Sequence, residues 1–243
     1  MKKLFILCIS LASLMSCDDN DNRKIVQDPK ALPELKKDTS TIEIADLPIL
    51  LDSTNYLIHP IGFYKTENRY KLGSYSSSSS DYDDGFGISV SRGGDVFSVN
   101  NLTNVSFQHI DSTELMPLTN KIIRITEMSF LKDVYKNSGK TVIIYEVRDF
   151  DTNNDQKLDY GDVRTLYISN IDGSNFTKLL PDFEDLREWK TILANNRLYF
   201  NSVEDTNKNC EFDKKDNMHY YTLDLNVSDF KPTEYFPLPK NKI

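Results

Sequence analysis

The stretch Asp151-Thr-Asn-Asn-Asp-Gln-Lys-Leu-Asp-Tyr-Gly-Asp162 places oxygen-bearing side chains at positions 1, 3, 5, 9 and 12 of a twelve-residue loop. That spacing is typical of calcium-binding loops, in which a short segment curls around a cation that prefers about six to eight oxygen ligands. The flanking segments, Thr141-Val-Ile-Ile-Tyr-Glu-Val147 and Thr165-Leu-Tyr-Ile-Ser169, are rich in β-branched and aromatic residues. Such segments favour strands, so the loop is predicted to join two strands.

The loop recurs 54 residues later as Asp205-Thr-Asn-Lys-Asn-Cys-Glu-Phe-Asp-Lys-Lys-Asp216. It again lies between two candidate strands, Arg197-Leu-Tyr-Phe-Asn201 and Tyr220-Tyr-Thr-Leu-Asp224. At the same offset Tyr145 aligns with Tyr199. The loop is therefore part of a sequence repeat rather than an isolated motif.

A calcium ion in each loop would be held by five side chains and by the main-chain carbonyl at position 7. The expected ligands are Asp151, Asn153, Asp155, Lys157, Asp159 and Asp162 in residues 151–162, and Asp205, Asn207, Asn209, Glu211, Asp213 and Asp216 in residues 205–216. The first loop supplies four ligand carboxylates and the second three, so the first is expected to bind Ca2+ more tightly. The alternative is that both are solvated acidic hairpin loops without a metal.

Both loops depart from the EF-hand pattern. Position 6, where an EF-hand has glycine in a left-handed turn, is Gln156 in one loop and Cys210 in the other. Either residue costs about 1–2 kcal/mol in that conformation. Position 12 is aspartate rather than glutamate in both loops. Strands rather than helices flank the loops, and a sensor needs hinged helices to convert binding into an opening motion, so the calcium is predicted to be structural.

From residue 46 onward, short apolar and aromatic segments alternate with turn-forming clusters, and no long helical period occurs. This pattern is typical of an all-β protein. Each loop-containing unit has a further strand in front of it, Ile122-Ile-Arg-Ile-Thr126 or Trp189-Lys-Thr-Ile-Leu193, and another behind it. Four antiparallel strands per unit is the content of a propeller blade, and about four such units fit into residues 46–243.

A weaker third copy occurs at Val105-Ser-Phe-Gln-His-Ile110 and reads like Leu166-Tyr-Ile-Ser-Asn-Ile171. The latter, continued by Asp172-Gly-Ser-Asn175, resembles the strand–turn–strand signature of TolB-like β-propeller repeats. It is similar as well to Bacteroidota lipoproteins of unknown function that carry EF-hand-like acidic loops between blade strands. The resemblance covers roughly residues 100–240 and implies a propeller-like fold with calcium-type loops.

The N-terminus has the features of an exported lipoprotein. Residues 1–16 combine a basic start with an apolar segment too short to span a membrane, which is typical of a signal peptide. Leu14-Met-Ser-Cys17 resembles the bacterial lipobox, so the membrane is an expected partner through a lipid on Cys17. Residues 17–45 are predicted to form a flexible tether before the folded body at residues 46–243. An ordinary cleaved signal peptide with a chance cysteine is the alternative.

The acidic run Asp18-Asp-Asn-Asp21 allows two locations. An aspartate here resembles an inner-membrane retention signal of enterobacterial lipoproteins, whereas an acidic cluster resembles a surface-export signal of Bacteroidota. The Asn-, Lys- and Tyr-rich composition is more similar to the second group, which favours an outer-membrane lipoprotein on the cell surface, with the periplasmic face as the alternative. The formal net charge of −8 disfavours nucleic-acid binding, because such a surface repels phosphate.

No catalytic constellation stands out in the sequence. His59, His109 and His219 are isolated, and Cys210 lies among acidic residues, which is unfavourable for a reactive thiolate. The sequence therefore favours a calcium-stabilised binding or scaffold module over an enzyme, with an unknown protein or glycan as partner. The alternative is an envelope hydrolase whose active site lies in a central funnel and is assembled from distant residues.

Overall fold

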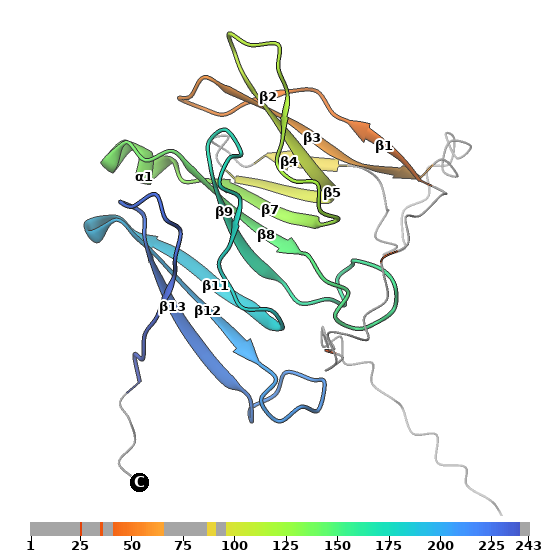
Figure 1. Ribbon diagram of the computed structural model, residues 1–243, viewed down its shortest axis with the longest axis vertical. Helices are drawn as coiled ribbons and strands as arrows, with labels where there is room; N and C mark the ends of the chain where they lie inside the picture. The colour runs from red at the N-terminus through yellow and green to blue at the C-terminus, as the bar shows by residue number, and fades with distance from the viewer. Residues whose placement is uncertain (1–24, 26–34, 36–40, 66–86, 91–95, 239–243) are drawn as a thin grey trace, which may run out of the picture.

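The computed structural model describes residues 25, 35, 41–65, 87–90 and 96–238, and the regular secondary structure among them is almost entirely β-strand (Figure 1). The predicted all-β class is confirmed, with one short α-helix, α1 (Lys132–Ser138), among the described residues. The predicted signal peptide, Cys17 and most of the tether lie outside the described residues. One predicted tether segment does not, because Thr41–Ala45 forms a strand and the sheet begins five residues before the predicted boundary.

The strands form two antiparallel sheets. The larger sheet contains β1 (Thr41–Ala45), β2 (Ile49–Leu50), β3 (Tyr56–Lys65), β4 (Gly87–Val90), β5 (Val96–His109), β6 (Met116–Pro117), β7 (Arg124–Phe130), β8 (Val142–Arg148), β9 (Thr165–Asn170) and β10 (Thr177–Lys178). Its order is β1-β3-β5-β7-β8-β9-β10, with β2 paired to β3 and both β4 and β6 paired to β5. The second sheet has the order β11 (Glu184–Ile192), β12 (Arg197–Glu204), β13 (Asn217–Asp224) and β14 (Thr233–Glu234).

The strands are stacked in layers, and β8 lies in the middle layer (Figure 1). Both of its faces are buried. Ile143 and Tyr145 pack into one hydrophobic cluster with β3 and β5, whereas Val142 and Ile144 pack into a second cluster with β12 and β13. A strand buried on both faces has no solvent face to make polar, which explains its nearly continuous apolar run.

Three parts of the chain fold in the same way. We call them unit one (β3, β5 and β6), unit two (β8, β9 and β10) and unit three (β12, β13 and β14). In each unit the same two main-chain N–H groups donate to the same two carbonyls. These pairs are Leu118–Val105, Leu179–Leu166 and Tyr235–Tyr220, each at 2.8 Å, and Ile110–Asn55 (2.9 Å), Ile171–Thr141 (3.0 Å) and Leu225–Asn196 (3.0 Å). The described residues thus contain three such units instead of about four, and they form no closed propeller.

The 54-residue offset holds for the acidic loops and for β9 against β13, but β8 and β12 correspond at an offset of 55. Tyr145 pairs with Tyr167, whereas Phe200, and not the expected Tyr199, pairs with Tyr221. The strand in front of each unit departs further from the repeat. β7 begins at Arg124 rather than at the predicted Ile122, and β11 begins at Glu184 rather than at the predicted Trp189. Residues 131–141 join β7 to β8, whereas only residues 193–196 join β11 to β12. The longer connection contains α1, so β7 lies further from β8 in the sequence than β11 lies from β12.

Candidate metal centre

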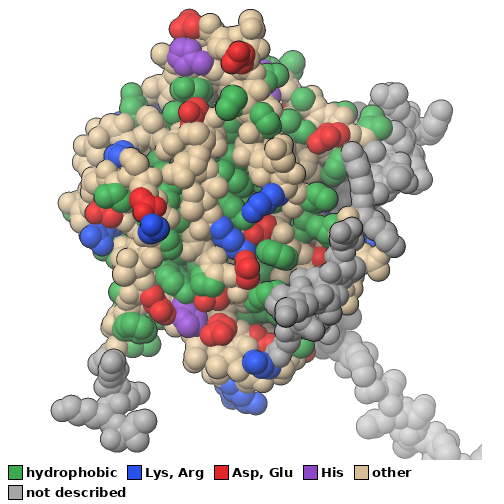
Figure 2. Space-filling view, in the orientation of Figure 1, with side chains coloured by type: hydrophobic (Ala, Val, Ile, Leu, Met, Phe, Trp, Pro, Cys, Tyr) green, Lys and Arg blue, Asp and Glu red, His purple; other side chains and the backbone are tan. Residues whose placement is uncertain are grey.

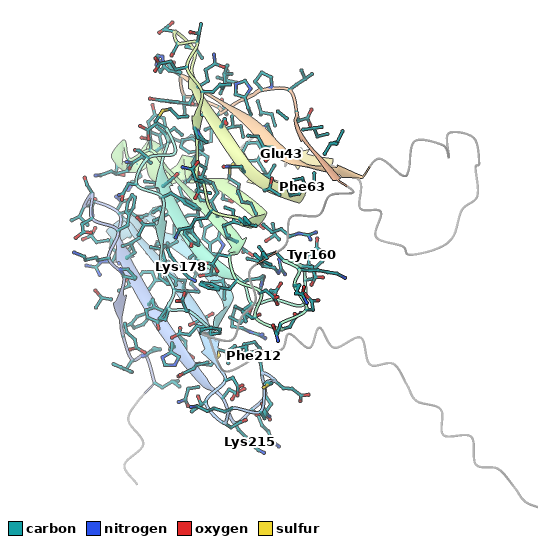
Figure 3. The ribbon with its side chains drawn as sticks, turned by 45° about the vertical axis from the view of Figure 1, so that its right-hand side comes forward. Glu43, Phe63, Tyr160, Lys178, Phe212 and Lys215 are labelled. Carbon is teal, nitrogen blue, oxygen red and sulfur yellow. The ribbon has the colours of Figure 1, made fainter. Side chains whose placement is uncertain are left out.

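The two acidic loops lie at the same end of the strands, loop one (residues 151–162) between β8 and β9 and loop two (residues 205–216) between β12 and β13. Figure 1 shows them one above the other, and Figure 3 labels Tyr160 in loop one and Phe212 and Lys215 in loop two. The strands on either side of each loop pair antiparallel, as predicted. The expected ligands therefore occupy two equivalent hairpin connections.

The first and last aspartates organise each loop in the same way. The aspartate at position 1 accepts main-chain N–H bonds from positions 5 and 6, and the aspartate at position 12 accepts them from positions 2 and 9. These bonds join Asp151 to Asp155 (3.2 Å) and Gln156 (2.7 Å), Asp162 to Thr152 (2.7 Å) and Asp159 (2.9 Å), Asp205 to Asn209 (3.2 Å) and Cys210 (2.8 Å), and Asp216 to Thr206 (3.1 Å) and Asp213 (2.7 Å).

The side chains at positions 3, 5 and 9 each accept the main-chain N–H two residues further on, which is the bond of an Asx turn. The acceptor–donor pairs are Asn153–Asp155 (2.9 Å), Asp155–Lys157 (2.9 Å) and Asp159–Gly161 (2.8 Å) in loop one, and Asn207–Asn209 (3.0 Å), Asn209–Glu211 (3.0 Å) and Asp213–Lys215 (2.7 Å) in loop two. Every expected side-chain ligand is thus turned back toward its own loop.

Positions 4 and 6 adopt left-handed conformations in both loops. The φ angles are 63° at Asn154 and 68° at Gln156 in loop one, and 60° at Lys208 and 68° at Cys210 in loop two. The left-handed turn expected at position 6 is therefore present although neither residue is glycine. A non-glycine residue in this region costs about 1–2 kcal/mol, so each loop holds a strained turn at the same place.

The carboxylates do not form a ready-made metal cage. Among the described residues, no group of three or more His, Cys, Asp or Glu side chains is placed to hold a metal ion. The expected ligands also include groups other than carboxylates, namely the asparagine side-chain amides and the main-chain carbonyls of Lys157 and Glu211. The donor types fit a hard cation, and calcium binding would require the carboxylates to draw closer together. Calcium binding stays a prediction.

Loop one is held against the body by two arginines. The Arg124 guanidinium donates to the Leu158 carbonyl (3.1 Å), and Arg148 donates through Nε to the Asp162 carbonyl (3.3 Å). Both guanidinium groups lie over the Tyr160 ring, at 5.0 Å and 4.9 Å from its centre. Such contacts contribute about 0.5–1 kcal/mol each at exposed sites. In loop two, position 10 is Lys214, so the aromatic part of this support is missing.

Burial makes the negative charge of loop one costly. Asp151 is 3% exposed and Asp162 is fully buried. Burial raises the pKa of the Asp162 carboxyl, the Asp151 charge adds to the rise, and the N–H bonds from Asp159 and Thr152 oppose it. A buried carboxylate needs a counter-charge or hydrogen bonds to remain ionised. A cation in loop one would supply such a counter-charge and relieve the repulsion between the two aspartates.

No local pattern in the sequence predicts the arginine support, because Arg124 and Tyr160 lie on different elements. Gly161 is the residue in loop one whose type does point to the close packing of the ligands. A Cβ on Gly161 would lie 2.5 Å from the Asn153 amide nitrogen and 3.2 Å from an Asp159 carboxylate oxygen. Glycine at position 11 therefore lets two expected ligands of loop one sit close to the main chain, and a side chain there would force them to move.

The remaining candidate residues do not assemble into a catalytic group. His59 hydrogen-bonds with Gln108 (2.8 Å), and His109 lies beside Asp111 (3.6 Å). His219 lies between Glu234 (2.8 Å) and Glu204 (3.1 Å). These side-chain contacts are separate for each histidine. The sequence did not predict the two glutamates around His219, which come from neighbouring strands β12 and β14.

Cys210 is half-buried, and its carbonyl accepts the Ile25 N–H at 3.4 Å.

No helix among the described residues is long and apolar enough to cross a bilayer. No model of a known protein family matches the chain, and no curated protein matches it either.

Proposed function

We propose that this chain is a lipid-anchored protein of the bacterial cell envelope whose propeller-like body is stabilised by calcium and acts as a binding or scaffold module. The observation that carries the proposal is the agreement between the two acidic loops. Seven of their twelve residues differ, yet they share their hydrogen bonds and their left-handed positions. A cation that binds the shared aspartates would offset the same strain in both.

Support for a propeller-like body comes from the three units. Their strands share the same main-chain hydrogen bonds, and unit two packs through one face against unit one and through the other against unit three. Units one and two belong to one continuous sheet that β7 joins, and unit three belongs to the second sheet. Antiparallel units that pack face to face are the architecture of propeller blades. In that arrangement both acidic loops extend from the same end of their units, where calcium would order each of them.

The anchor and the location are proposed from the lipobox-like Leu14-Met-Ser-Cys17 and from the acidic run that follows it. We assign the protein to the outer membrane, facing the cell exterior. Figure 2 shows side chains of both charges scattered over one face of the body with hydrophobic side chains between them. Because the charges are mixed, this face has no strong net electrostatic potential. A protein or glycan partner would therefore be selected by short-range contacts.

Thermal unfolding of the mature chain carrying Cys17→Ser tests the calcium part. A ligand that binds only the folded state adds about 2.7 kcal/mol at a hundred times its Kd, which corresponds to a rise in Tm of about 2–4 °C per kcal/mol for a chain of this size. Millimolar calcium should raise Tm above its value in chelator, and magnesium should raise it less. A Tm that is the same in calcium and in chelator would refute structural calcium.

Metabolic labelling with a fatty acid tests the anchor. The wild-type chain should carry the label and fractionate with the outer membrane, and Cys17→Ala should remove the label. Protease added to intact cells should digest the body if it faces outward. Protection of the body in intact cells, with digestion after the outer membrane is opened, would contradict surface display and would place the protein on the periplasmic face.

A further inference from the structure

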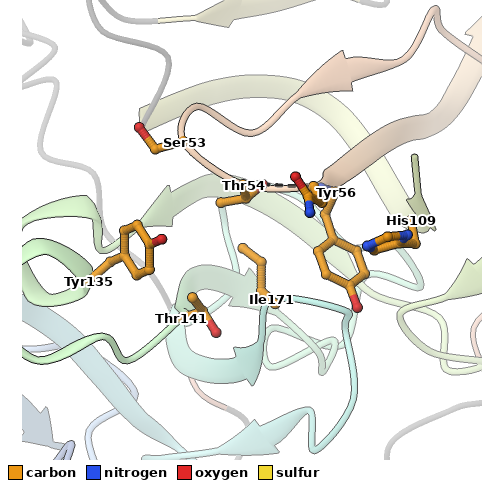
Figure 4. Close-up of a pocket in the computed structure, with 8 residues that line it drawn as sticks. Ser53, Thr54, Tyr56, His109, Tyr135, Thr141 and Ile171 are labelled. Carbon is orange, nitrogen blue, oxygen red and sulfur yellow. Dashed lines mark hydrogen bonds between the residues drawn. The ribbon is translucent and has the colours of Figure 1, made fainter. Parts of the chain in front are cut away.

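A pocket of about 320 Å³ lies at the end of the strands opposite the acidic loops, where unit one meets unit two. Residues 53–56 and His109 line it from unit one, and Tyr135, Thr141 and Ile171 line it from α1 and unit two. Figure 4 shows Tyr135 on one side and Tyr56 with His109 on the other. The volume is at the lower end of the range of about 300–1,000 Å³ for small-molecule sites.

The lining is uncharged and combines rings with hydroxyl and amide groups. Tyr56 and His109 meet edge to face with their ring centres 5.2 Å apart, and Tyr135 supplies the third ring. None of the described lining residues is Lys, Arg, Asp or Glu. Such a lining places no opposite formal charge beside a phosphate, a carboxylate or an ammonium group. It suits a neutral ligand that has both an apolar face and hydrogen-bonding groups.

Several polar groups of the lining have no hydrogen-bond partner within the described part of the chain. They are the hydroxyls of Tyr56, Tyr135 and Thr141 and the amide of Asn55. His109 accepts the Asp111 main-chain N–H at Nδ1 (3.3 Å), so its Nε2 carries the proton of the neutral ring and is a donor. Hydroxyl groups both donate and accept, so a ligand rich in hydroxyls would satisfy all of these groups.

The equivalent seam between units two and three is closed. Asn196, which occupies the repeat position of Thr141, is buried and donates to Ser138 (3.1 Å) and to Asn226 (2.8 Å). Asn137 donates to the Leu193 carbonyl across the same seam (3.1 Å). The fold therefore fills one seam with its own polar side chains, where the Asn196 amide nitrogen is bonded and its Oδ1 is buried without a partner, and leaves the other seam open.

One edge of the pocket is fixed in shape. The Thr54 hydroxyl donates to the Leu51 carbonyl (2.8 Å) and accepts the Tyr56 N–H (3.2 Å). Ser53 has a φ of 65°, a strained conformation for serine, and the neighbouring Asp52 forms an ion pair with Lys132. A strained, internally bonded turn keeps its side chains in place before a ligand arrives, which reduces the entropy cost of binding.

We propose that this pocket binds one ring of a neutral sugar, presented as the end of a glycan. A sugar ring has an apolar C–H face, which would pack on the tyrosine rings, and a rim of hydroxyls, which would pair with Thr141, Asn55 and the tyrosine hydroxyls. The inference rests on the proposed role as a binding module and does not rest on calcium. It names the class of ligand and the place where that ligand binds.

Calorimetric titration of the mature Cys17→Ser chain with D-glucose, D-galactose, D-mannose and N-acetyl-D-glucosamine tests the proposal. At least one of these should bind with a Kd in the millimolar range or tighter. Thr141→Val and Tyr135→Phe each remove one hydroxyl and should weaken binding about two- to tenfold. Tyr135→Ala also removes a ring and should weaken it by about tenfold or more. Tyr220→Phe, on the second sheet away from the pocket, is the matched control and should leave the Kd unchanged.

D-glucuronate and D-glucosamine serve as charged counterparts and should bind more weakly than the neutral sugars. The proposal is overturned if no neutral sugar binds to chain that is folded by circular dichroism, or if Thr141→Val and Tyr135→Phe bind as the wild type does. Each titration is run in calcium and in chelator. If Tm depends on calcium but no sugar binds, only the sugar proposal is refuted. If a sugar binds but Tm does not depend on calcium, only the calcium proposal is refuted.

Discussion

Loop one and loop two share one conformation but differ in what surrounds them. Asp162 at the end of loop one is fully buried, whereas its counterpart Asp216 is half-buried. Thr152 is likewise buried, and its counterpart Thr206 is exposed. The comparison separates conformation from stability. The residue pattern determines the conformation of each loop, and the burial of the loop against the sheet determines how much that loop contributes to the stability of the fold.

The largest expected effect is on the closing aspartate. Asp162→Ala should lower the free energy of unfolding by about 2–3 kcal/mol, because it leaves the buried main-chain N–H of Thr152 and the part-buried N–H of Asp159 without an acceptor. Asp216→Ala should cost less than about 1 kcal/mol, because water reaches its partners. Urea unfolding in chelator measures both without any metal contribution. Asp111→Ala, in an exposed turn, is the control, and equal losses in the two loops would contradict the comparison.

The arginine support should have the next largest effect. Tyr160→Ala removes the ring from two guanidinium contacts and should cost about 1–2 kcal/mol. Lys214→Ala changes the same position of loop two and should leave the free energy of unfolding unchanged. The ring can also be tested by Tyr160→Phe, which keeps both contacts and should retain most of the wild-type stability. A loss as large as that of Tyr160→Ala would show that the hydroxyl, and not the ring, matters.

Calcium affinity gives a way to make the loops more alike. Asn209→Asp gives loop two a fourth ligand carboxylate, as in loop one, and should strengthen its calcium binding about tenfold, since affinity rises with ligand charge. Asp155→Asn should weaken loop one by a similar factor. Isothermal titration calorimetry with calcium measures the dissociation constants of the two loops. Two variants that leave both affinities unchanged would show that these positions are not ligands.

The smallest expected effect is the pH dependence from His219, beside loop two. Burial lowers the pKa of its imidazole, but the hydrogen bond to Glu234, the Glu184 charge and the bond to Glu204 raise it more. Its contribution to stability is therefore fully present below the unfolded pKa near 6.5 and is lost as pH rises through the higher folded pKa. His219→Gln should be destabilising by less than about 1 kcal/mol at pH 5 and close to neutral at pH 8.5. Urea unfolding at the two pH values checks this, and a larger loss at pH 8.5 would contradict it.

The ligand spacing and the turn at position 6 could be predicted from the sequence because the bonds around the first aspartate are local. Every bond from Asp151 reaches no further than five residues along the chain, and such short-range side-chain bonds depend on residue type and spacing. The strands on either side were predicted for the same reason. The contact of Arg124 with Tyr160 was not, since it requires β7 to lie beside β8, and strand pairing at that distance leaves no local pattern.

The pocket shows the same limit. Tyr56 and Thr141 lie in segments that are far apart in the sequence, and nothing in either segment marks it as part of a binding site. The sequence repeat even argues against a special site there, because the same seam recurs between units two and three. What distinguishes the two seams is that Asn196 is large enough to bridge its seam, whereas Thr141 leaves space.

The double burial of β8 has a consequence for how this repetitive chain unfolds. Repeat proteins whose units touch only their neighbours through modest interfaces can lose units one at a time. Here β8 and its neighbour β9 both supply side chains to the two hydrophobic clusters, so neither outer unit can detach without exposing one face of both strands to water. The three units should therefore behave as one cooperative block, with the amide protons of β8 among the last to exchange with solvent.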